Sequence, residues 1–337
     1  MIKEAISQII SGHSLTMDEA SQVMGEIMEG QVTPAQFGAF VTALRLKGET
    51  VEEIAGMAKT MRARAVRVTI DEPVVDTCGT GGDNAATFNI STAAAFVVAG
   101  AGAKVAKHGN RAMSSKCGSA DVLEALGVKI DLTAEQVQRC LKEVGIGFMF
   151  APSFHPAMKY AAGPRKEIGI RTVFNILGPL TNPAGAQAQV LGVADGALVE
   201  KMAKVLQLLG CHHALVVHSE DGLDELTVTG RSYISELKDD KLRRYAIAPE
   251  DVGLSRATLP DLKGGTAAEN ACLLREVFSG TPGHAQDAVV LNAAAALVAC
   301  DKVSTLREGV LLAEESIESG RAAEKLDRLI ALTRSFI

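Results

Sequence analysis

Glycines, hydroxyls and cations gather in one stretch of the chain, from Gly79 to Asp121. The stretch reads GTGGDNAATFNIST, continues through residues rich in Ala, Val and Gly, and ends with KHGNRAMSSKCGSAD. Glycine-rich turns let backbone N–H groups approach an anion closely, and hydroxyls and cations such as Lys107 and Arg111 supply further donors. So dense a set of anion-binding groups predicts a site for a polyphosphate or a phosphosugar.

The first turn of this stretch, Gly79–Asp83, follows a predicted strand at Val74–Thr77. It is not a dinucleotide fingerprint, because Asn84 stands where the motif needs glycine, and no GK[ST] follows as in a P-loop. Asn89–Thr92 comes next, at the predicted N-terminus of a helix over Ser91–Ala101, where free N–H groups and the helix dipole favour anions. A plain tight turn is the alternative, and the neighbouring motif favours a ligand.

The second turn, KHGNR at Lys107–Arg111, follows a predicted strand at Lys104–Lys107. A solvated basic turn would account for the two cations alone. The imidazole, the amide, and the nearby Ser114 and Ser115 favour a ligand instead. His108 is either a ligand contact or an ordinary histidine at the sheet edge.

An acidic turn, Asp221–Glu225, follows a predicted strand at Ala214–Val217. Neighbouring side chains on a strand point to opposite faces, whereas in a turn Asp224 and Glu225 can converge on one cation. Mg²⁺ prefers carboxylate oxygens and bridges to substrate phosphates. A charged surface turn is the alternative. Its expected place on the same sheet edge as the two phosphate turns favours a metal site.

The elements that must position these turns fall into two groups. Residues 1–65 read as helices only, each begun by a capping signature. The capping pairs are Thr16 and Glu19, Thr33 and Gln36, and Thr50 and Glu53. These helices are either a cap on the rest of the chain or a dimerisation module.

From Val74 onward, strand-like and helical segments alternate, which predicts an α/β fold with a mainly parallel central sheet flanked by helices. Ligands bind at the carboxyl ends of the strands in such sheets, where all three turns fall. The later predicted elements are strands at Val128–Ile130, Ile146–Phe150 and Val190–Val193, and helices at Thr133–Val144 and Leu198–Leu209.

We therefore expect a small N-terminal helical domain over residues 1–66 and a large α/β domain over residues 71–337. The proline-rich segment 155–186 is expected either to pack back against the helices or to form the hinge. Three positive charges, Lys159, Arg165 and Lys166, lie near Gly163 in this segment.

Bulk composition excludes several classes of protein. Lys and Arg number 34 against 40 Asp and Glu, and the net charge of −6 argues against broad nucleic-acid binding. None of the six cysteines has CxxC spacing, so free thiols in a reducing compartment are expected. No signal peptide or membrane-length apolar run is present, which predicts a cytoplasmic protein.

The motifs GTGGD, TFNIST, KHGNR, GPLTNP and HSEDGLDE occur in this order, and the chain resembles the anthranilate phosphoribosyltransferase family of the tryptophan pathway. The resemblance implies a nucleoside phosphorylase-like (type III phosphoribosyltransferase) fold. It also implies transfer of the phosphoribosyl group from phosphoribosyl pyrophosphate (PRPP) to the amine of anthranilate, giving N-(5-phosphoribosyl)anthranilate and pyrophosphate. This is the second step from chorismate to tryptophan. Two departures from the family pattern stand beside the binding turns: Asn84 where Gly is common, and Cys117 where Ser is frequent.

The resemblance also implies roles for individual residues. The donor, PRPP, would be bound by Gly79, Gly82, Asp83, Thr87, Asn89, Ile90, Ser91, Thr92, Lys107, His108, Gly109, Asn110, Arg111, Ala112, Met113, Ser114, Ser115 and Ser119. Anthranilate would be contacted by Gly79, His108, Asn110 and Arg165. Ser91, Asp224 and Glu225 would ligate two Mg²⁺ per monomer. Lys107 and Arg165 would act electrostatically, and a homodimer would form through the N-terminal helices.

Two other functions fit the same fold. A pyrimidine nucleoside phosphorylase would split nucleosides with phosphate and need no metal pair, and the KHGNR turn and the Asp224–Glu225 pair argue against it. A non-catalytic nucleic-acid-binding relative would need a basic groove and salt-sensitive binding. The negative net charge and the intact donor motifs argue against that alternative.

Overall fold

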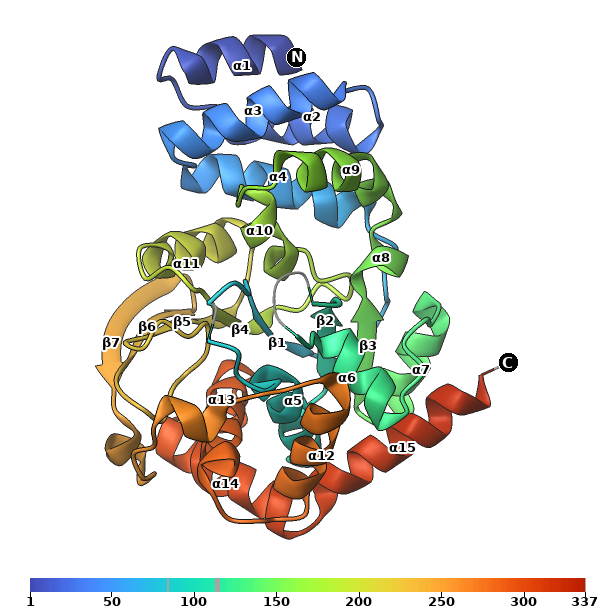
Figure 1. Ribbon diagram of the computed structural model, residues 1–337, viewed down its shortest axis with the longest axis vertical. Helices are drawn as coiled ribbons and strands as arrows, with labels where there is room; N and C mark the ends of the chain where they lie inside the picture. Colours follow the sequence, from blue (N-terminus) through green and yellow to red (C-terminus); the bar gives the residue numbers. More distant parts are fainter. Residues whose placement is uncertain (84, 113–115, 337) are drawn as a thin grey trace.

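The computed structural model describes residues 1–83, 85–112 and 116–336. Helices α1 (Ile2–Ile10), α2 (Met17–Met28), α3 (Pro34–Lys47) and α4 (Val51–Arg64) form one end of an elongated molecule (Figure 1). At the start of α2, α3 and α4, a threonine hydroxyl accepts the N–H of the residue three positions on, whose side chain bonds back to the threonine N–H. The three predicted capping boxes are therefore confirmed.

The rest of the chain is built on a seven-stranded sheet with the strand order β3-β2-β1-β4-β5-β6-β7. The strands are β1 (Val75–Gly79), β2 (Val105–Gly109), β3 (Ile146–Phe150), β4 (Ala188–Gly192), β5 (His213–Ser219), β6 (Ser232–Lys238) and β7 (Lys241–Ile247). Neighbouring strands among β1 to β5 run parallel, and β5, β6 and β7 pair antiparallel. The prediction of a mainly parallel sheet is confirmed.

The hairpin of β6 and β7 extends the sheet beyond the elements predicted from sequence. Its turn consists of Asp239 and Asp240, whose φ angles are 48° and 62°. Two residues with positive φ form the tight turn whose twist matches paired strands, and Asp tolerates this conformation better than most residues.

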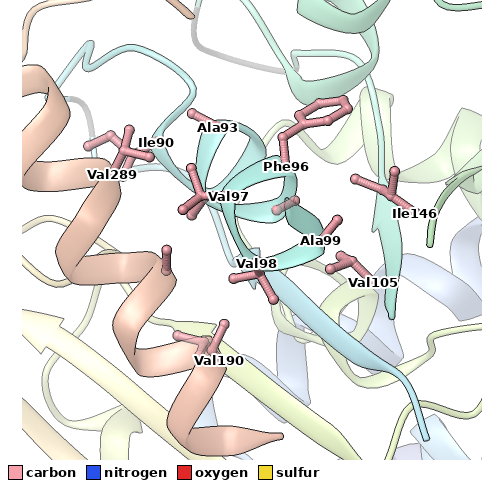
Figure 2. Packing of buried hydrophobic residues seen from close by; sticks show 14 of the residues in the cluster. Ile90, Ala93, Phe96, Val97, Val98, Ala99, Val105, Ile146, Val190 and Val289 are labelled. Atoms are coloured by element: carbon pink, nitrogen blue, oxygen red, sulfur yellow. The ribbon is translucent and has the colours of Figure 1, made fainter. Parts of the chain in front are cut away.

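Helices cover both faces of the sheet. They are α5 (Ile90–Gly100), α6 (Ser119–Leu126), α7 (Ala134–Glu143), α11 (Leu198–Leu208), α12 (Ala267–Phe278), α13 (His284–Ala299), α14 (Leu306–Glu318) and α15 (Arg321–Ser335). Along β5, Leu215 and Val217 join the core beneath α5 and α13, while Ala214 and Val216 join the core shared with α11 and the N-terminal helices. Figure 2 shows α5 between α13, which carries Val289, and the strands that carry Val105 and Ile146.

One predicted strand is wrong. Residues Val128–Ile130 follow α6 without pairing to any strand of the described sheet. The N–H of Lys129 donates to the Thr333 hydroxyl of α15 over 3.2 Å, so a helix side chain satisfies this backbone. Val128 and Ile130 are buried in the core, which explains why the segment reads as apolar.

The connection between β3 and β4 runs from the sheet to the N-terminal helices and back (Figure 1). It contains α8 (Ala151–Phe154), η1 (Pro156–Met158), α9 (Lys159–Ile168), α10 (Phe174–Leu177) and η2 (Gly178–Leu180). Helix α9 lies against α2 and α3. The Arg62 guanidinium of α4 donates to the carbonyl oxygens of Leu180, over 2.6 Å, and Leu209, over 3.2 Å, which joins this connection to α11. In the ranges described, no helix combines the length and the apolar character that crossing a bilayer requires.

Candidate active site at the carboxyl edge of the sheet

The first glycine turn contacts the acidic loop. Strand β1 ends at Gly79, and Gly81 and Gly82 follow with φ angles of 69° and 80°, a conformation that glycine adopts without steric penalty. The Gly81 N–H donates to Oδ2 of Asp224 over 2.6 Å. A Cβ on Gly79 would lie 2.2 Å from the same oxygen, so only glycine leaves room for this carboxylate. Tertiary structure thus joins two motifs that are 143 residues apart.

The second carboxylate of the acidic pair lies at the start of α5. The Ser91 N–H donates to Oε1 of Glu225 over 3.2 Å, and the Thr77 hydroxyl of β1 donates to the Ser91 carbonyl over 3.0 Å. Ile90 and Thr92, on either side of Ser91, are buried. The N-terminus of α5 therefore already faces an acidic side chain, as the helix dipole favours.

Asp224 and Glu225 form a buried acidic pair. Burial raises the pKa of Asp224, and the neighbouring charge of Asp83 raises it further. Burial also raises the pKa of Glu225, with repulsion from Asp224 next in importance. Like charges held together out of water need a counter-charge, which a divalent cation supplies. Within the described ranges no three His, Cys, Asp or Glu side chains gather as a complete metal cage, so a cation here would draw further ligands from hydroxyls and from its substrate.

Lys107 approaches this pair from β2. Its ammonium group donates to the Thr77 carbonyl oxygen and lies 3.4 Å from the Ser91 hydroxyl. Burial lowers the pKa of Lys107, while the charge of Asp76, and more weakly that of Glu225, opposes this shift. The side chain is 3% exposed, so its positive charge acts on the site with little screening by water.

His108 points away from Lys107, because adjacent residues of a strand point to opposite faces of the sheet. Its ring lies 5.0 Å from that of His155, centroid to centroid. Burial, followed by the neighbouring His155, lowers the pKa of His108 to about 3, and burial lowers that of His155 to about 4. Both imidazoles are neutral near pH 7. Among the described groups, Nε2 of His108 and both ring nitrogens of His155 are buried without a hydrogen-bond partner, which marks a polar surface prepared for another group.

The residues after β2 form a separate cluster on α6. The Ser119 hydroxyl donates to the Asn110 carbonyl over 3.2 Å, and the Ala112 N–H donates to Asp121 over 3.0 Å. A Cβ on Gly109 would lie 2.2 Å from the Ser119 hydroxyl. Arg111 pairs with Asp121 over 3.0 Å and also with Glu124, so carboxylates of α6 neutralise its charge. Met113, Ser114 and Ser115 lie outside the described residues.

Asn89 connects this cluster to α5. It is the N-cap residue, yet its side chain does not cap the helix. Its Nδ2 donates to the Cys117 carbonyl over 3.1 Å, and its Oδ1 accepts the Cys117 thiol over 3.2 Å and Nδ2 of Asn270 over 2.9 Å. The Cys117 thiol thus makes a hydrogen bond that a serine hydroxyl would also make. The other departure, Asn84, lies outside the described residues.

Asp83 and Thr87 lie on the loop between β1 and α5. Oδ1 of Asp83 accepts the Ala85 N–H over 3.3 Å. Thr87 forms an isolated antiparallel bridge with Lys263, and the Phe88 N–H donates to the Leu262 carbonyl over 3.1 Å. The loop therefore rests on the segment before α12.

Arg165 lies apart from the donor turns, on α9. Its guanidinium is half-buried, 5.4 Å from the centre of the Phe174 ring. Burial lowers the pKa of Arg165. No salt bridge engages it among the described residues, so its charge is available to an anion.

Sequence reasoning missed several polar residues beside the predicted set. They are Asp76, His155, Arg171, Asn182 and Asn270. The segment GIRT, directly after α9, was the one signal for Arg171, because a cation beside glycine in a crossing segment resembles the other turns.

Comparisons with known proteins extend these observations. The a/b domain model of a glycosyl transferase family matches residues 71–323, and the helical bundle domain model matches residues 3–65. A relative from Moorella thermoacetica, named anthranilate phosphoribosyltransferase, is 59% identical over 337 residues, which is 100% of this chain and 99% of its own. The crystal structure of anthranilate phosphoribosyltransferase from Thermus thermophilus has a TM-score of 0.94 and 46% identity, over 98% of this chain and 99% of that chain.

The Saccharomyces cerevisiae enzyme of the same name is more distant in sequence. In complex with PRPP and Mg, it has a TM-score of 0.91 and 28% identity, over 99% of this chain and 98% of that chain. In complex with 4-fluoroanthranilate, the TM-score is 0.90 at the same identity of 28% and the same coverage.

Proposed function

The chain belongs to the anthranilate phosphoribosyltransferase family, and from this premise we propose how its residues bind the two substrates and stabilise the reaction. Its reaction transfers the phosphoribosyl group of PRPP to the amine of anthranilate in tryptophan biosynthesis. The observation that carries the assignment is the contact of the buried Asp224–Glu225 pair with the amides of Gly81 and Ser91. Metal-binding carboxylates and anion-binding amides lie together there, as a metal-bound pyrophosphate requires.

The donor pyrophosphate is proposed to bind between the Gly79–Asp83 turn and the N-terminus of α5. The Gly81 N–H of the turn and the Ser91 N–H at the start of α5 both donate to the acidic pair here, and Lys107 adds a buried positive charge. The remaining donor contacts are proposed from Thr87, Asn89, Ile90, Ser91, Thr92, the segment from His108 to Ser115, and Ser119. Arg111 reaches the donor only by leaving Asp121 and Glu124.

The residues fit Mg²⁺, since a buried acidic pair with raised pKa values needs a counter-charge. The yeast relative binds Mg together with PRPP. We propose that Asp224, Glu225 and the Ser91 hydroxyl hold two Mg²⁺ per monomer. When bound, Mg²⁺ neutralises charge on the pyrophosphate as it leaves.

Anthranilate is proposed to bind between the β2 turn and the connecting segment. The Arg165 guanidinium can pair with the anthranilate carboxylate through two hydrogen bonds. Asn110 and the Gly79 backbone would contact the ring or the amine. The neutral His108 offers hydrogen-bonding groups and does not repel the positive charge that develops on the sugar ring. The yeast relative binds 4-fluoroanthranilate, which has the same carboxylate and amine.

Catalysis follows from positioning and electrostatics. As pyrophosphate departs from C1 of the ribose, positive charge develops on the sugar ring, and Lys107 and the turn amides stabilise the departing negative charge. The anthranilate amine attacks the opposite face and inverts the configuration. This amine is neutral at pH 7, so no residue need act as a strong general base.

The oligomeric state is proposed to be a homodimer through residues 1–66, the helical domain, with segment 155–186 as the hinge to the α/β domain of residues 71–337. Leu46 is 84% exposed and Ile10 is 71% exposed on these helices, which is unusual for large apolar side chains. Light scattering of the purified protein measures its oligomeric state, and Leu46→Glu is expected to shift the equilibrium from dimer toward monomer.

The decisive experiment neutralises the acidic pair. Asp224→Asn with Glu225→Gln is expected to abolish Mg²⁺-dependent loss of anthranilate fluorescence in the presence of PRPP. Glu220→Gln is the matched control, because Glu220 is an exposed acid just before the same loop whose side chain accepts the Arg231 N–H, away from the Gly81 and Ser91 amides. An unchanged Mg²⁺ response in the double variant would exclude the pair as the metal site.

A further inference from the structure

Arg171 joins the donor turn to the segment that carries Arg165. Its guanidinium donates to the Gly82 carbonyl over 2.7 Å and to the Gly81 carbonyl over 2.8 Å. A Cβ on Gly82 would lie 1.9 Å from Nη1 of Arg171, so the guanidinium lies directly against the glycine backbone. None of the roles assigned above uses this side chain.

The two hydrogen bonds fix the direction of neighbouring amides. In a planar trans peptide the C=O and the following N–H point in opposite directions, and the chain has no cis peptide among the described residues. Holding the Gly81 carbonyl toward Arg171 therefore directs the Gly82 N–H away from it. Holding the Gly82 carbonyl in the same way directs the Asp83 N–H away from it.

A further amide of the same turn contacts the acidic pair, because the Gly81 N–H donates to Asp224. No Cβ restricts the peptide planes of these glycines, and among the described residues the Gly81 carbonyl has one other donor, the Thr80 hydroxyl over 3.3 Å. Arg171 is suited to hold these planes because a guanidinium is planar, always charged and carries parallel donors.

Arg171 also comes from the acceptor side of the proposed site. Helix α9 ends where the Gly169 N–H bonds to the Arg165 carbonyl, with Gly169 at a φ of 66°. Arg171 follows two residues later. The segment that places Arg165 therefore also places the cation that holds the donor turn.

We propose that Arg171 is a positioning residue for the donor: by holding the Gly81 and Gly82 carbonyls, it orients the Gly82 and Asp83 N–H groups toward the pyrophosphate of PRPP. This rests on the proposed donor site. The residue acts through the backbone, takes no part in bond making, and links donor binding to the placement of the acceptor segment.

The test compares substrate constants of Arg171→Ala in the full chain with Mg²⁺ present. The KM for PRPP is expected to rise about ten- to a hundredfold, since two charge-assisted hydrogen bonds are lost, while the KM for anthranilate changes by less than about twofold. Arg171→Lys keeps the charge but not the planar pair of donors, so its KM for PRPP is expected to lie between those of wild type and Arg171→Ala. Millimolar guanidinium is expected to restore part of the affinity of Arg171→Ala for PRPP, and urea, its neutral analogue, is not.

Two variants serve as references. Lys166→Ala removes an exposed positive charge from the same segment, so it measures the long-range effect of charge alone, and its KM for PRPP is expected to stay close to wild type. Gly79→Ala directs a methyl group at the Asp224 carboxylate and therefore reports on the donor site itself.

The outcomes separate the two proposals. If Arg171→Ala binds PRPP normally by calorimetry while Gly79→Ala does not, the positioning role is overturned and the donor site stands. If both variants bind PRPP normally, the proposed donor site fails as well. Equal rises in the two KM values, without rescue by guanidinium, would assign Arg171 a general structural role and overturn the inference.

Discussion

Asn182 donates its side-chain N–H to the buried carboxylate of Asp76 over 2.7 Å, between residues 106 positions apart. The same amide donates to the Ala106 carbonyl over 2.8 Å, and the other Asp76 oxygen accepts the His108 N–H over 3.2 Å. Burial raises the pKa of Asp76 to about 6, and these donors oppose the shift. The connection that returns from the N-terminal helices is thus joined to β1 and β2, directly beneath the proposed site.

Removing the amide is expected to destabilise the α/β core. Asn182→Ala should lower the free energy of unfolding by about 1–3 kcal/mol at pH 7, because Asp76 and Ala106 each lose a buried donor. Asn182→Asp should lower the free energy of unfolding further than Asn182→Ala, although Asp matches Asn in size, because two buried carboxylates would then repel each other. Urea unfolding measures both. The difference in unfolding free energy between the two variants should be smaller at pH 5, where Asp76 is largely protonated. Equal unfolding free energies at pH 7 would contradict this account.

Arg165→Ala is expected to raise the KM for anthranilate about tenfold or more and to leave the KM for PRPP nearly unchanged, because the carboxylate loses a two-point partner. Arg165→Lys, which keeps the charge without the fork, should recover only part of the loss. Initial rates from anthranilate fluorescence at varied concentrations of each substrate measure the two constants. Equal rises in both would remove Arg165 from the acceptor site.

Glu53 is expected to matter more to stability than its position in a capping box suggests. It is fully buried and accepts the Leu15 N–H over 2.9 Å, the Thr50 N–H over 2.7 Å and the Lys47 ammonium over 3.0 Å. Glu53→Ala should cost about 3 kcal/mol, since three donors lose their acceptor, one of them a cation.

Glu19→Ala is the matched comparison for Glu53→Ala. Glu19 occupies the same position in the capping box of α2, is only partly buried and bonds mainly to Thr16, so its loss should cost about 1 kcal/mol. Circular dichroism during urea unfolding measures both variants. Equal losses would mean that the buried contacts of Glu53 add nothing to the cap.

His213 is expected to give stability that depends on pH. The ring is fully buried, with Nδ1 3.1 Å from Asp301 and Nε2 3.1 Å from Glu236, so each ring nitrogen has a carboxylate partner. The His213 hydrogen bond lowers the pKa of Glu236. Burial raises the pKa of Asp301, but bonds from Lys238 and His213 outweigh it and lower the value. His213→Gln should cost about 2 kcal/mol at pH 7.

A lowered carboxylate pKa contributes stability above the ordinary values, 4.5 for Glu and 3.8 for Asp, and this stability is lost as the pH falls through the folded-state values. The difference in unfolding free energy between wild type and His213→Gln should therefore become smaller below about pH 4. His212→Gln is the control: His212 is 54% exposed and 3.7 Å from Asp301, so little change is expected. A gap that stays constant with pH would contradict the assignment.

Local patterns in the sequence predicted much of the fold. The capping boxes at Thr16, Thr33 and Thr50 are all present, because each depends on residues only three positions apart. The parallel strands and their helices were predicted by the alternation of apolar and polar segments. The predicted strand at Val128–Ile130 is wrong, because an apolar run is equally consistent with a buried connection, here one whose Lys129 N–H donates to the Thr333 hydroxyl.

Motif spacing could not tell which side chains of a turn act together. Lys107 and Arg111 lie in one short motif, and sequence alone groups them. The strand directs Lys107 to the buried side with Thr77, whereas Arg111, beyond the strand end, pairs with carboxylates of α6.

The sequence by itself determined the groups available for chemistry: the glycine turns, the acidic pair, the cations, and the alternation of strands and helices that predicts a mainly parallel sheet with these turns at one edge. Tertiary structure alone decided that Asp224 meets the Gly81 amide and that Arg171 bonds to the Gly81 and Gly82 carbonyls of the same turn. The physical reason is that local hydrogen bonds and periodicity act within a few residues. These contacts instead join segments 89 to 143 residues apart, whose approach depends on how the whole sheet and its connections pack.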